Sequence, residues 1–229
     1  MDTEFMEYIR KSIKANEKAA KEMAMKKRQE KAMELLKKSG LGKRFAKRTF
    51  ENFEKKGLSP ELLNAYNKAL EFAIKFPEVG KGLLFTGPVG TGKTHLAAAV
   101  ANRLIENLYS VIFGNVTDII TLIKTSYRKD SELTEAEIIK LFTDDTDVFI
   151  FDDLGKENTT ENTSTLIYQI INRLYENEKL VIVTTNFTSA ALRKKLGEKG
   201  EAIMSRLAEM CEFIKVTGPD WRLKVVEED

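Results

Sequence analysis

Gly87-Pro-Val-Gly90-Thr-Gly92-Lys93-Thr94 is the stretch of this 229-residue chain that decides its fold. The apolar residues 82–86 before it predict a buried strand, and the residues from Lys93 onward predict a helix. Glycine leaves no Cβ between the backbone N–H groups of such a turn and a phosphate. The helix N-terminus adds further N–H donors and a partial positive charge. The pattern G-x-x-x-x-G-K-[ST] therefore predicts a loop that holds the phosphates of a nucleotide.

The side chains of this loop have distinct predicted roles. Lys93 can reach the β- and γ-phosphates, and the Thr94 hydroxyl can bind Mg²⁺. An accidental glycine turn is the alternative, and the strand before the loop and the helix after it argue against that alternative. The predicted nucleotide contacts are Gly87, Pro88, Val89, Gly90, Thr91, Gly92, Lys93, Thr94 and His95.

Two carboxylates follow a second apolar run, Val148-Phe-Ile-Phe-Asp152-Asp153, about 60 residues after the loop. Ligand sites in open parallel sheets lie at the carboxyl ends of strands, which is where these carboxylates would stand. We expect Asp152 to hold Mg²⁺ and Asp153 to orient or deprotonate the attacking water. A strand that ends in an Asp-Asp turn is common and alone indicates little. The motif indicates a nucleotide site because it follows the glycine-rich loop in a series of alternating strands and helices.

Two further segments carry polar residues of interest. Val181-Ile-Val-Thr184-Thr185-Asn186 is a buried strand that ends in side chains able to reach the γ-phosphate or the water, although Thr185 or Asn186 can also cap the next turn. Ser205-Arg206-Leu207 lies on a predicted helix before the last strand. An arginine from a neighbouring subunit can stabilise charge on a transferring phosphoryl group. An exposed helical arginine is the alternative for Arg206, and the residues alone favour that alternative.

Strands and helices are predicted to alternate from Lys81 onward, which favours βαβ units and a parallel sheet. The predicted strands are 82–86, 110–115, 148–151, 180–184 and 211–216. The predicted helices are 93–108, 117–127, 134–141, 164–176, 189–196 and 202–210. An earlier helix over 60–76 is marked by Ser59 as cap and by Pro60, and Thr134 with Glu137 forms a capping box.

Composition excludes several classes of protein. One Cys and one His leave no disulfide framework within the chain, no Cys-based zinc site and no His-rich metal site. No apolar run approaches the roughly 18 residues that span a bilayer, so no membrane partner is expected. The charged start has no apolar core of a secretory signal, and a reducing cytoplasm is the expected location.

The formal net charge of +2 conceals a division along the chain. Residues 1–48 hold 15 Lys+Arg and 7 Asp+Glu, a net of +8, so the remainder carries −6. Helix-forming residues and an apolar stripe of Phe5, Ile9 and Ile13 predict a helical arm here. A solvated helix is one interpretation of the basic charge, and contact with nucleic acid or an acidic partner surface is the other.

Taken together, these segments resemble the AAA+ ATPases, and more narrowly the helicase loaders of the DnaC/DnaI type, close to the IstB-like ATPases. The resemblance covers residues 42–222. It is carried by Arg44-Phe…Thr49-Phe-Glu-Asn-Phe53, Gly87–Thr94, Asp152-Asp-Leu-Gly-Lys-Glu157, Thr184-Thr-Asn-Phe187, Ser205-Arg-Leu207 and Gly218-Pro-Asp-Trp-Arg222.

The resemblance implies an α/β fold, a P-loop AAA+ core with a parallel five-stranded sheet. Only 23 residues follow Arg206, so a full C-terminal lid domain is not expected. The resemblance divides the chain into a basic helical arm over 1–41, a connector and helix over 42–80, and the ATPase core over 81–229. ATP and Mg²⁺ are the implied cofactors. Lys93 and Thr94 would be the Walker A contacts, Asp152 and Asp153 the Walker B pair, Asn186 sensor 1, Arg206 a trans-acting arginine finger and Arg222 a sensor-2-like arginine.

The implied function is that of an ATP-dependent loader, which delivers a replicative helicase onto single-stranded DNA in a bacterial or phage-infected cell. The arm would contact the helicase, and the core would assemble with ATP as a homo-oligomer. Residues 117–143 are long enough for two helices, and their Lys124, Tyr127 and Arg128 offer charge and a stacking ring for a single strand. An ordinary solvated helix face is the alternative there.

Two other functions share these motifs. One is an IstB-like transposition ATPase. The other is a nucleotide-gated adaptor with negligible hydrolysis, because the second carboxylate, Asp153, is one methylene shorter than the Glu of many AAA+ proteins.

Overall fold

The computed structural model describes residues 7, 11–20, 23, 26–27, 30, 45–54, 58–128, 131, 133–144, 146–157 and 160–221. Five strands form one parallel sheet in the order β2-β3-β4-β1-β5. Each observed strand boundary lies within one residue of the predicted one, and the parallel sheet confirms the predicted fold class. The strands are β1 (Gly82–Thr86), β2 (Val111–Asn115), β3 (Val148–Asp152), β4 (Leu180–Thr185) and β5 (Cys211–Lys215).

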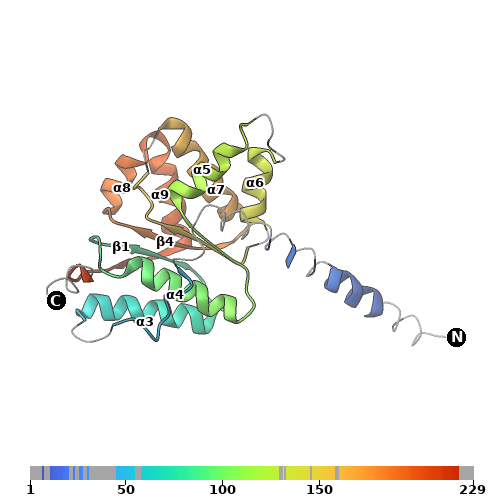
Figure 1. Ribbon diagram of the computed structural model, residues 1–229, viewed down its shortest axis with the longest axis horizontal. Coiled ribbons are helices and arrows are strands. Elements are labelled where there is room, and N and C mark those ends of the chain that lie inside the picture. The colour runs from blue at the N-terminus through green and yellow to red at the C-terminus, as the bar shows by residue number, and fades with distance from the viewer. Residues whose placement is uncertain are drawn as a thin grey trace.

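Helices cover both faces of the sheet (Figure 1). Helices α3 (Pro60–Lys75) and α4 (Lys93–Glu106) lie on one face. The opposite face is covered by α5 (Val116–Thr125), α6 (Glu135–Thr143), α7 (Glu161–Glu176), α8 (Ser189–Lys195), the short 3₁₀ helix η1 (Gly197–Lys199) and α9 (Gly200–Met210).

The alternation of side chains along each strand explains the two layers. Leu83 and Phe85 of β1 pack into the core beneath α3 and α4. Leu84, between them, packs into the core beneath α7 and α9. Both faces of the central strands β1, β3 and β4 are buried, so these strands are mostly apolar, as is typical of parallel sheets. The edge strand β5 instead exposes Glu212, Phe213 and Lys215.

Local capping sets where the helices begin and end. Ser59 caps α3 with Pro60 in its first turn, and the predicted capping box of Thr134 and Glu137 is present at α6. Helix α7 begins three residues before the predicted Ser164, because the Thr160 hydroxyl accepts a hydrogen bond from the Thr163 N–H at 3.2 Å. Helix α4 ends at Glu106 rather than at the predicted Leu108, whose φ of 66° is left-handed.

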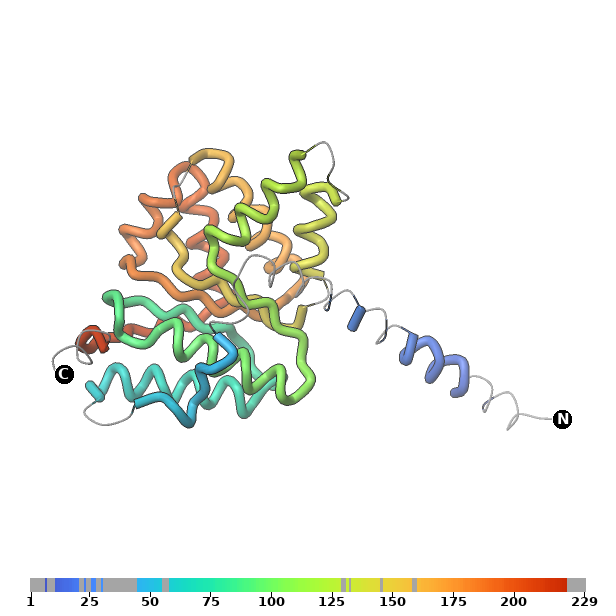
Figure 2. Tube along the Cα trace, viewed as in Figure 1, coloured from blue at the N-terminus to red at the C-terminus, as the bar shows by residue number. Residues whose placement is uncertain are grey.

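The connector before α3 packs along α4 (Figure 2). The Asn102 amide donates hydrogen bonds to the carbonyl oxygens of Phe45 and Arg48, at 3.0 and 2.7 Å. Arg103 forms an ion pair with Glu51 at 2.7 Å. These contacts hold the connector against the last turns of α4, the helix whose first residues are the predicted phosphate contacts.

The described part of the predicted arm is helical. Residues 11–20 form a helix whose side chains are all exposed, and Ile13 of the predicted apolar stripe is 51% exposed. Phe5 and Ile9 of that stripe lie outside the described residues. Within the described residues, no helix is long and apolar enough to cross a membrane.

Gly82→Ala is expected to lower the free energy of unfolding by about 2–4 kcal/mol, because a Cβ at this position would lie 1.8 Å from the carbonyl oxygen of Val181 in β4. The strands would have to separate to admit the methyl group. Urea unfolding followed by circular dichroism measures the change. Gly80→Ala is the matched control, since a Cβ there meets nothing within 4 Å. An equal effect of the two substitutions would contradict the packing explanation.

Candidate nucleotide-binding site

Three neighbouring strands, β3, β4 and β1, end at the same edge of the sheet. The glycine-rich loop follows β1, the two carboxylates end β3, and Thr184-Thr185-Asn186 ends β4. This places the three sequence motifs together at the carboxyl edge, where open parallel sheets bind their ligands.

The glycine-rich loop has the backbone that its sequence predicts. Gly90 and Gly92 have φ values of 79° and 97°, which side-chain-bearing residues rarely adopt. Gly92 caps α4, so the first N–H groups of that helix face the loop. Lys93 is 4% exposed, and its ammonium donates hydrogen bonds to the carbonyl oxygens of Gly87 and Pro88, at 2.8 and 2.6 Å. The lysine is therefore held against the loop that it is predicted to serve.

Asp152 is the centre of a cluster of oxygen atoms. Its Oδ1 accepts hydrogen bonds from the hydroxyls of Thr94 and Thr184, each at 2.7 Å. The carboxylate is 3% exposed, and this burial raises its pKa, while the bonds from Thr184 and Thr94 oppose the shift. A nearby cation would favour the charged form.

The Thr94 hydroxyl and the Asp152 carboxylate fit Mg²⁺, which takes oxygen ligands and is usually held by one or two carboxylates with phosphates and water. Among the described residues, no group of three His, Cys, Asp or Glu side chains forms a metal cage. The ion would therefore rest on these two side chains and on the phosphates that it accompanies.

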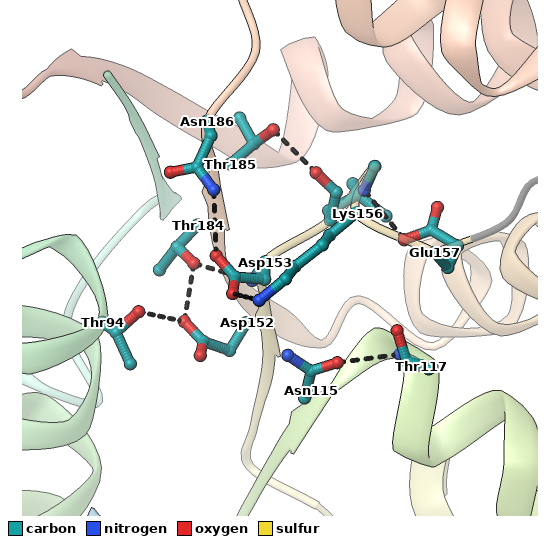
Figure 3. A network of polar contacts seen from close by, with 12 residues as sticks. Thr94, Asn115, Thr117, Asp152, Asp153, Lys156, Glu157, Thr184, Thr185 and Asn186 are labelled. Atoms are coloured by element: carbon teal, nitrogen blue, oxygen red, sulfur yellow. Dashed lines mark hydrogen bonds and ion pairs between the residues drawn. The ribbon is translucent and has the colours of Figure 1, made fainter. Parts of the chain in front are cut away.

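Asp153 lies beside this cluster (Figure 3), and its backbone conformation is unusual. Its φ is 59°, and its N–H donates to the Thr184 hydroxyl at 2.9 Å. The Asn186 amide donates to Asp153 Oδ1, and the Lys156 ammonium pairs with Oδ2, each at 3.2 Å. Such strain in a well-tethered residue is typical of functional sites.

The sequence pattern predicts Asn186 near the attacking water. It does not indicate Lys156 as a partner of Asp153, or Thr184 as the link between the Asp152 carboxylate and the Asp153 backbone N–H. The one sequence signal for that ion pair is the spacing of three residues between Asp153 and Lys156. A turn at 153–156 brings the two residues together.

His95 lies on α4, and its Nε2 bonds to the carbonyl oxygen of Thr49 at 2.9 Å. Its ring packs edge-to-face on Phe53, with ring centroids 5.0 Å apart. Burial lowers the pKa of the imidazole, which therefore favours the neutral ring that donates to Thr49. These contacts join His95 to the connector, and its predicted nucleotide contact stays a prediction.

The C-terminal segment reaches the tip of the loop. The Trp221 N–H donates to the carbonyl oxygen of Gly90 at 3.2 Å, and a Cβ on Gly90 would meet the Asp220 carboxylate at 1.9 Å. No sequence pattern indicated this contact. Arg222, the predicted sensor-2-like residue, lies outside the described residues.

The other predicted site residues lie apart from this cluster. Arg206 of α9 bonds to residues of α7 and of its own helix. The predicted pair of helices between β2 and β3 is present as α5 and α6. Lys124 donates to the Thr163 hydroxyl at 3.4 Å, Tyr127 is 52% exposed and bonds to Glu135, and Arg128 is exposed. These three residues share one segment, and their contact with DNA stays a prediction.

A phosphate-binding loop before a helix, a Walker B pair two strands away in the sheet and an asparagine at the end of the strand between them define a P-loop ATPase of the AAA+ class. The chain belongs to the family of IstB-like ATP binding proteins, whose pattern it matches over residues 4–228.

Known proteins with similar sequences or structures agree with this assignment. The chain is 27% identical to the protein YdaV of Escherichia coli K12 over 216 residues, which cover 94% of this chain and 84% of that protein. It is 29% identical to the replicative helicase loader DnaC of the same strain over 145 residues, which cover 63% of this chain but only 57% of DnaC. The crystal structure of the DnaC helicase loader superposes with a TM-score of 0.67 and 30% identity, covering 77% of this chain and all of that structure.

Proposed function

We propose that this protein is an ATP-dependent loader that delivers a replicative helicase onto single-stranded DNA. The observation that carries the proposal is the likeness to the DnaC helicase loader, which extends over the whole of that solved structure. The assembled ATPase site supports it, because a loader must couple nucleotide turnover to the release of its cargo.

The side chains at the sheet edge have separate roles in the proposed reaction. The loop N–H groups and the Lys93 ammonium would bind the phosphates, with Lys93 exchanging its loop carbonyls for phosphate oxygens. Thr94 and Asp152 would hold Mg²⁺, which supplies charge neutralisation on the phosphates when bound. Asp153 would accept a hydrogen bond from the attacking water, while Asn186 fixes the orientation of that carboxylate.

We assign the parts of the chain in keeping with this function. Residues 1–41 would be the arm that docks on the helicase, 42–80 the connector and helix, and 81–229 the ATPase core. The exposed helix at 11–20 supports the docking role, because none of its side chains is buried against the core. The core would assemble with ATP as a homo-oligomer, with Lys124, Tyr127 and Arg128 toward single-stranded DNA.

Two observations keep other functions in view. The family is named for IstB, which supports an ATPase that serves a transposase rather than a helicase. Lys156 and Asn186 each hold one oxygen of Asp153, which supports an adaptor with negligible hydrolysis. Steady-state phosphate release, with and without single-stranded DNA, separates an ATPase from such an adaptor.

Reversing the charge of the arm is expected to abolish capture of the helicase while ATP binding is unchanged. The variant Lys11→Glu, Lys14→Glu, Lys18→Glu removes positive charge from an exposed helix and adds negative charge, so a partner with an acidic surface would be repelled. A pull-down from bacterial lysate with ATP present, read for replicative helicase and for transposase, measures the effect.

The matched control makes the same change of charge on the core, with Lys75→Glu, Lys140→Glu and Lys179→Glu. A second variant that lacks residues 1–41 tests the arm as a whole. If both arm variants capture helicase as the unaltered protein does, the arm is not the docking element. If transposase is captured instead, the transposition ATPase is the better assignment.

A further inference from the structure

Arg206 is held by two side chains and one backbone carbonyl of its own subunit. Its Nε donates to Asn172 Oδ1 at 2.8 Å, one terminal nitrogen donates to the Tyr168 hydroxyl at 3.1 Å, and the other donates to the carbonyl oxygen of Ala202 at 3.3 Å. The guanidinium carbon lies 4.8 Å from the ring centroid of Tyr168 and 5.6 Å from that of Tyr175. Two aromatic rings and three oxygen acceptors thus fix one arginine.

The spacing of residues on α7 creates this arrangement. Tyr168, Asn172 and Tyr175 stand at i, i+4 and i+7, so they share one face of the helix. The Asn172 amide nitrogen donates to Glu176 at 2.8 Å, which turns the amide oxygen toward Arg206. The Tyr175 hydroxyl donates to Glu209 at 2.8 Å, so its hydrogen bond does not run to Arg206. We call Tyr168 and Asn172, the two α7 residues that accept hydrogen bonds from Arg206, the arginine cradle.

The cradle holds Arg206 without neutralising it. All three hydrogen-bond acceptors are uncharged, and no carboxylate in the described part of the chain forms an ion pair with Arg206. Arg173, on the same helix α7, is different, because its guanidinium binds both oxygens of Asp144 at 2.7 and 2.9 Å. Arg206 is also only half-buried. A fixed, uncompensated guanidinium with remaining N–H groups is suited to bind an oxyanion such as phosphate.

The nucleotide site of the same chain is not the partner. The cradle and α9 lie on one face of the sheet, whereas α4, which carries Lys93 and Thr94, lies on the other (Figure 1). None of the hydrogen bonds of Arg206 runs to the loop, to the Walker B pair or to Asn186. An oxyanion that Arg206 binds would therefore belong to another molecule.

We propose that the arginine cradle is a positioning device, which presents Arg206 to the terminal phosphate of a nucleotide bound in a second copy of this chain. The face formed by α7 and α9 is then the surface that each subunit offers to its neighbour's ATP. This inference rests on the proposed assembly with ATP and on the role of trans-acting arginine finger that the resemblance to the AAA+ ATPases implies for Arg206.

The physical advantage of the cradle is preorganisation. A free arginine loses side-chain freedom when it is fixed at an interface, and that loss weakens the interaction. The cradle fixes the guanidinium before the subunits meet, so the charge that develops on the phosphoryl group encounters a donor already in place. Helix α9 alone cannot do this, because only the Ala202 carbonyl comes from its own turn.

Oligomers that mix two variant chains separate the role of the cradle from that of Arg206, the arginine finger. A chain with Lys93→Ala cannot use its own site but can donate Arg206, and a chain with Arg206→Ala can bind ATP but lacks a finger. A productive interface needs ATP only in the Arg206→Ala chain. In a random 1:1 mixture about one quarter of interfaces pair the two chains productively, so about one quarter of unaltered turnover is expected.

The cradle variants are placed on the donor chain. Adding Asn172→Ala to the Lys93→Ala chain is expected to lower turnover of the mixture about tenfold, and adding Tyr168→Phe about fivefold, because each removes a hydrogen bond to the charged guanidinium. Tyr175→Phe is the matched control: it removes a hydroxyl that bonds to Glu209 and keeps the ring beside Arg206, so the mixture should change less than about twofold.

Each outcome is informative, with oligomer mass measured by light scattering in every mixture. If the parent mixture of Lys93→Ala and Arg206→Ala has no turnover, the finger does not act between subunits, and the inference falls with that proposal. If the parent mixture is active and the Asn172→Ala and Tyr168→Phe donors support it equally well, the finger stands and the cradle is refuted. A loss that follows Tyr175→Phe as strongly as Tyr168→Phe would also overturn the cradle.

Discussion

Lys93→Ala is expected to weaken ATP binding by at least about 100-fold, on the order of 3 kcal/mol, because a charge-assisted contact with the phosphates disappears from a buried position. The side chain is only 4% exposed, so water screens its charge little. Its ammonium already lies within 2.8 Å of two loop carbonyls, which places it at the loop before any ligand is considered. Titration with a fluorescent ATP analogue measures the change.

A matched control distinguishes a lost phosphate contact from a general loss of positive charge. Lys81→Ala removes an exposed lysine just before β1, at the opposite end of that strand from the loop. It should leave ATP affinity within about twofold, because a solvated charge so far from the phosphates is screened. Thermal unfolding of both variants shows whether the fold is retained. Unchanged ATP binding by a folded Lys93→Ala protein would refute the phosphate-loop assignment.

The order of helices and strands could be predicted because the spacing of apolar residues agrees with the positions of the capping and turn residues along this chain. The apolar runs at β3 and β4 have the length of buried strands, and Ser59-Pro60 marks a helix start by local chemistry alone. The predicted start of α7 was late because Thr160 caps a first turn of polar residues, in which an apolar pattern gives no signal. Helix ends that depend on a single backbone angle, such as that of Leu108, are likewise invisible to a pattern of apolar residues.

The residues of the candidate site also fall into two groups, those that a local sequence motif predicts and those that depend on contacts between distant segments. Lys93, Thr94, Asp152 and Asp153 were predicted because each belongs to a short motif in which spacing and chemistry are linked. Thr184 could be seen only as a polar end to a strand, since its two bonds to the Walker B pair require β3 and β4 to be neighbours in the sheet. The contact of Asp220 and Trp221 with Gly90 joins segments 130 residues apart, and no local pattern encodes it.

Arg206→Ala is expected to leave ATP affinity within about twofold and to lower turnover by about 10³ or more, the effect of removing an arginine that stabilises charge on a transferring phosphoryl group. Affinity should persist because every hydrogen bond of Arg206 runs to α7 or α9 and none to the nucleotide-binding loop. Turnover should fall because the finger acts when charge develops in the transition state. ATP-analogue titration and steady-state phosphate release on the same preparation measure the two quantities.

Two further substitutions show whether the loss is specific to the guanidinium. Arg206→Lys keeps a positive charge but loses the planar fork that bonds at once to Asn172 and Tyr168, so most of the loss should remain. Arg103→Ala removes an arginine whose partner is the exposed Glu51, and surface pairs of this kind contribute little, so turnover should be nearly unchanged. Restoration of turnover by lysine would show that bulk charge is sufficient and that the geometry of the fork is not needed. Equal losses of affinity and turnover in Arg206→Ala would show that the arginine contributes to binding of ATP itself and not only to the transition state. Arg206 lies on the face of the sheet opposite α4, so a contact with the ATP of its own chain would require its surroundings to rearrange.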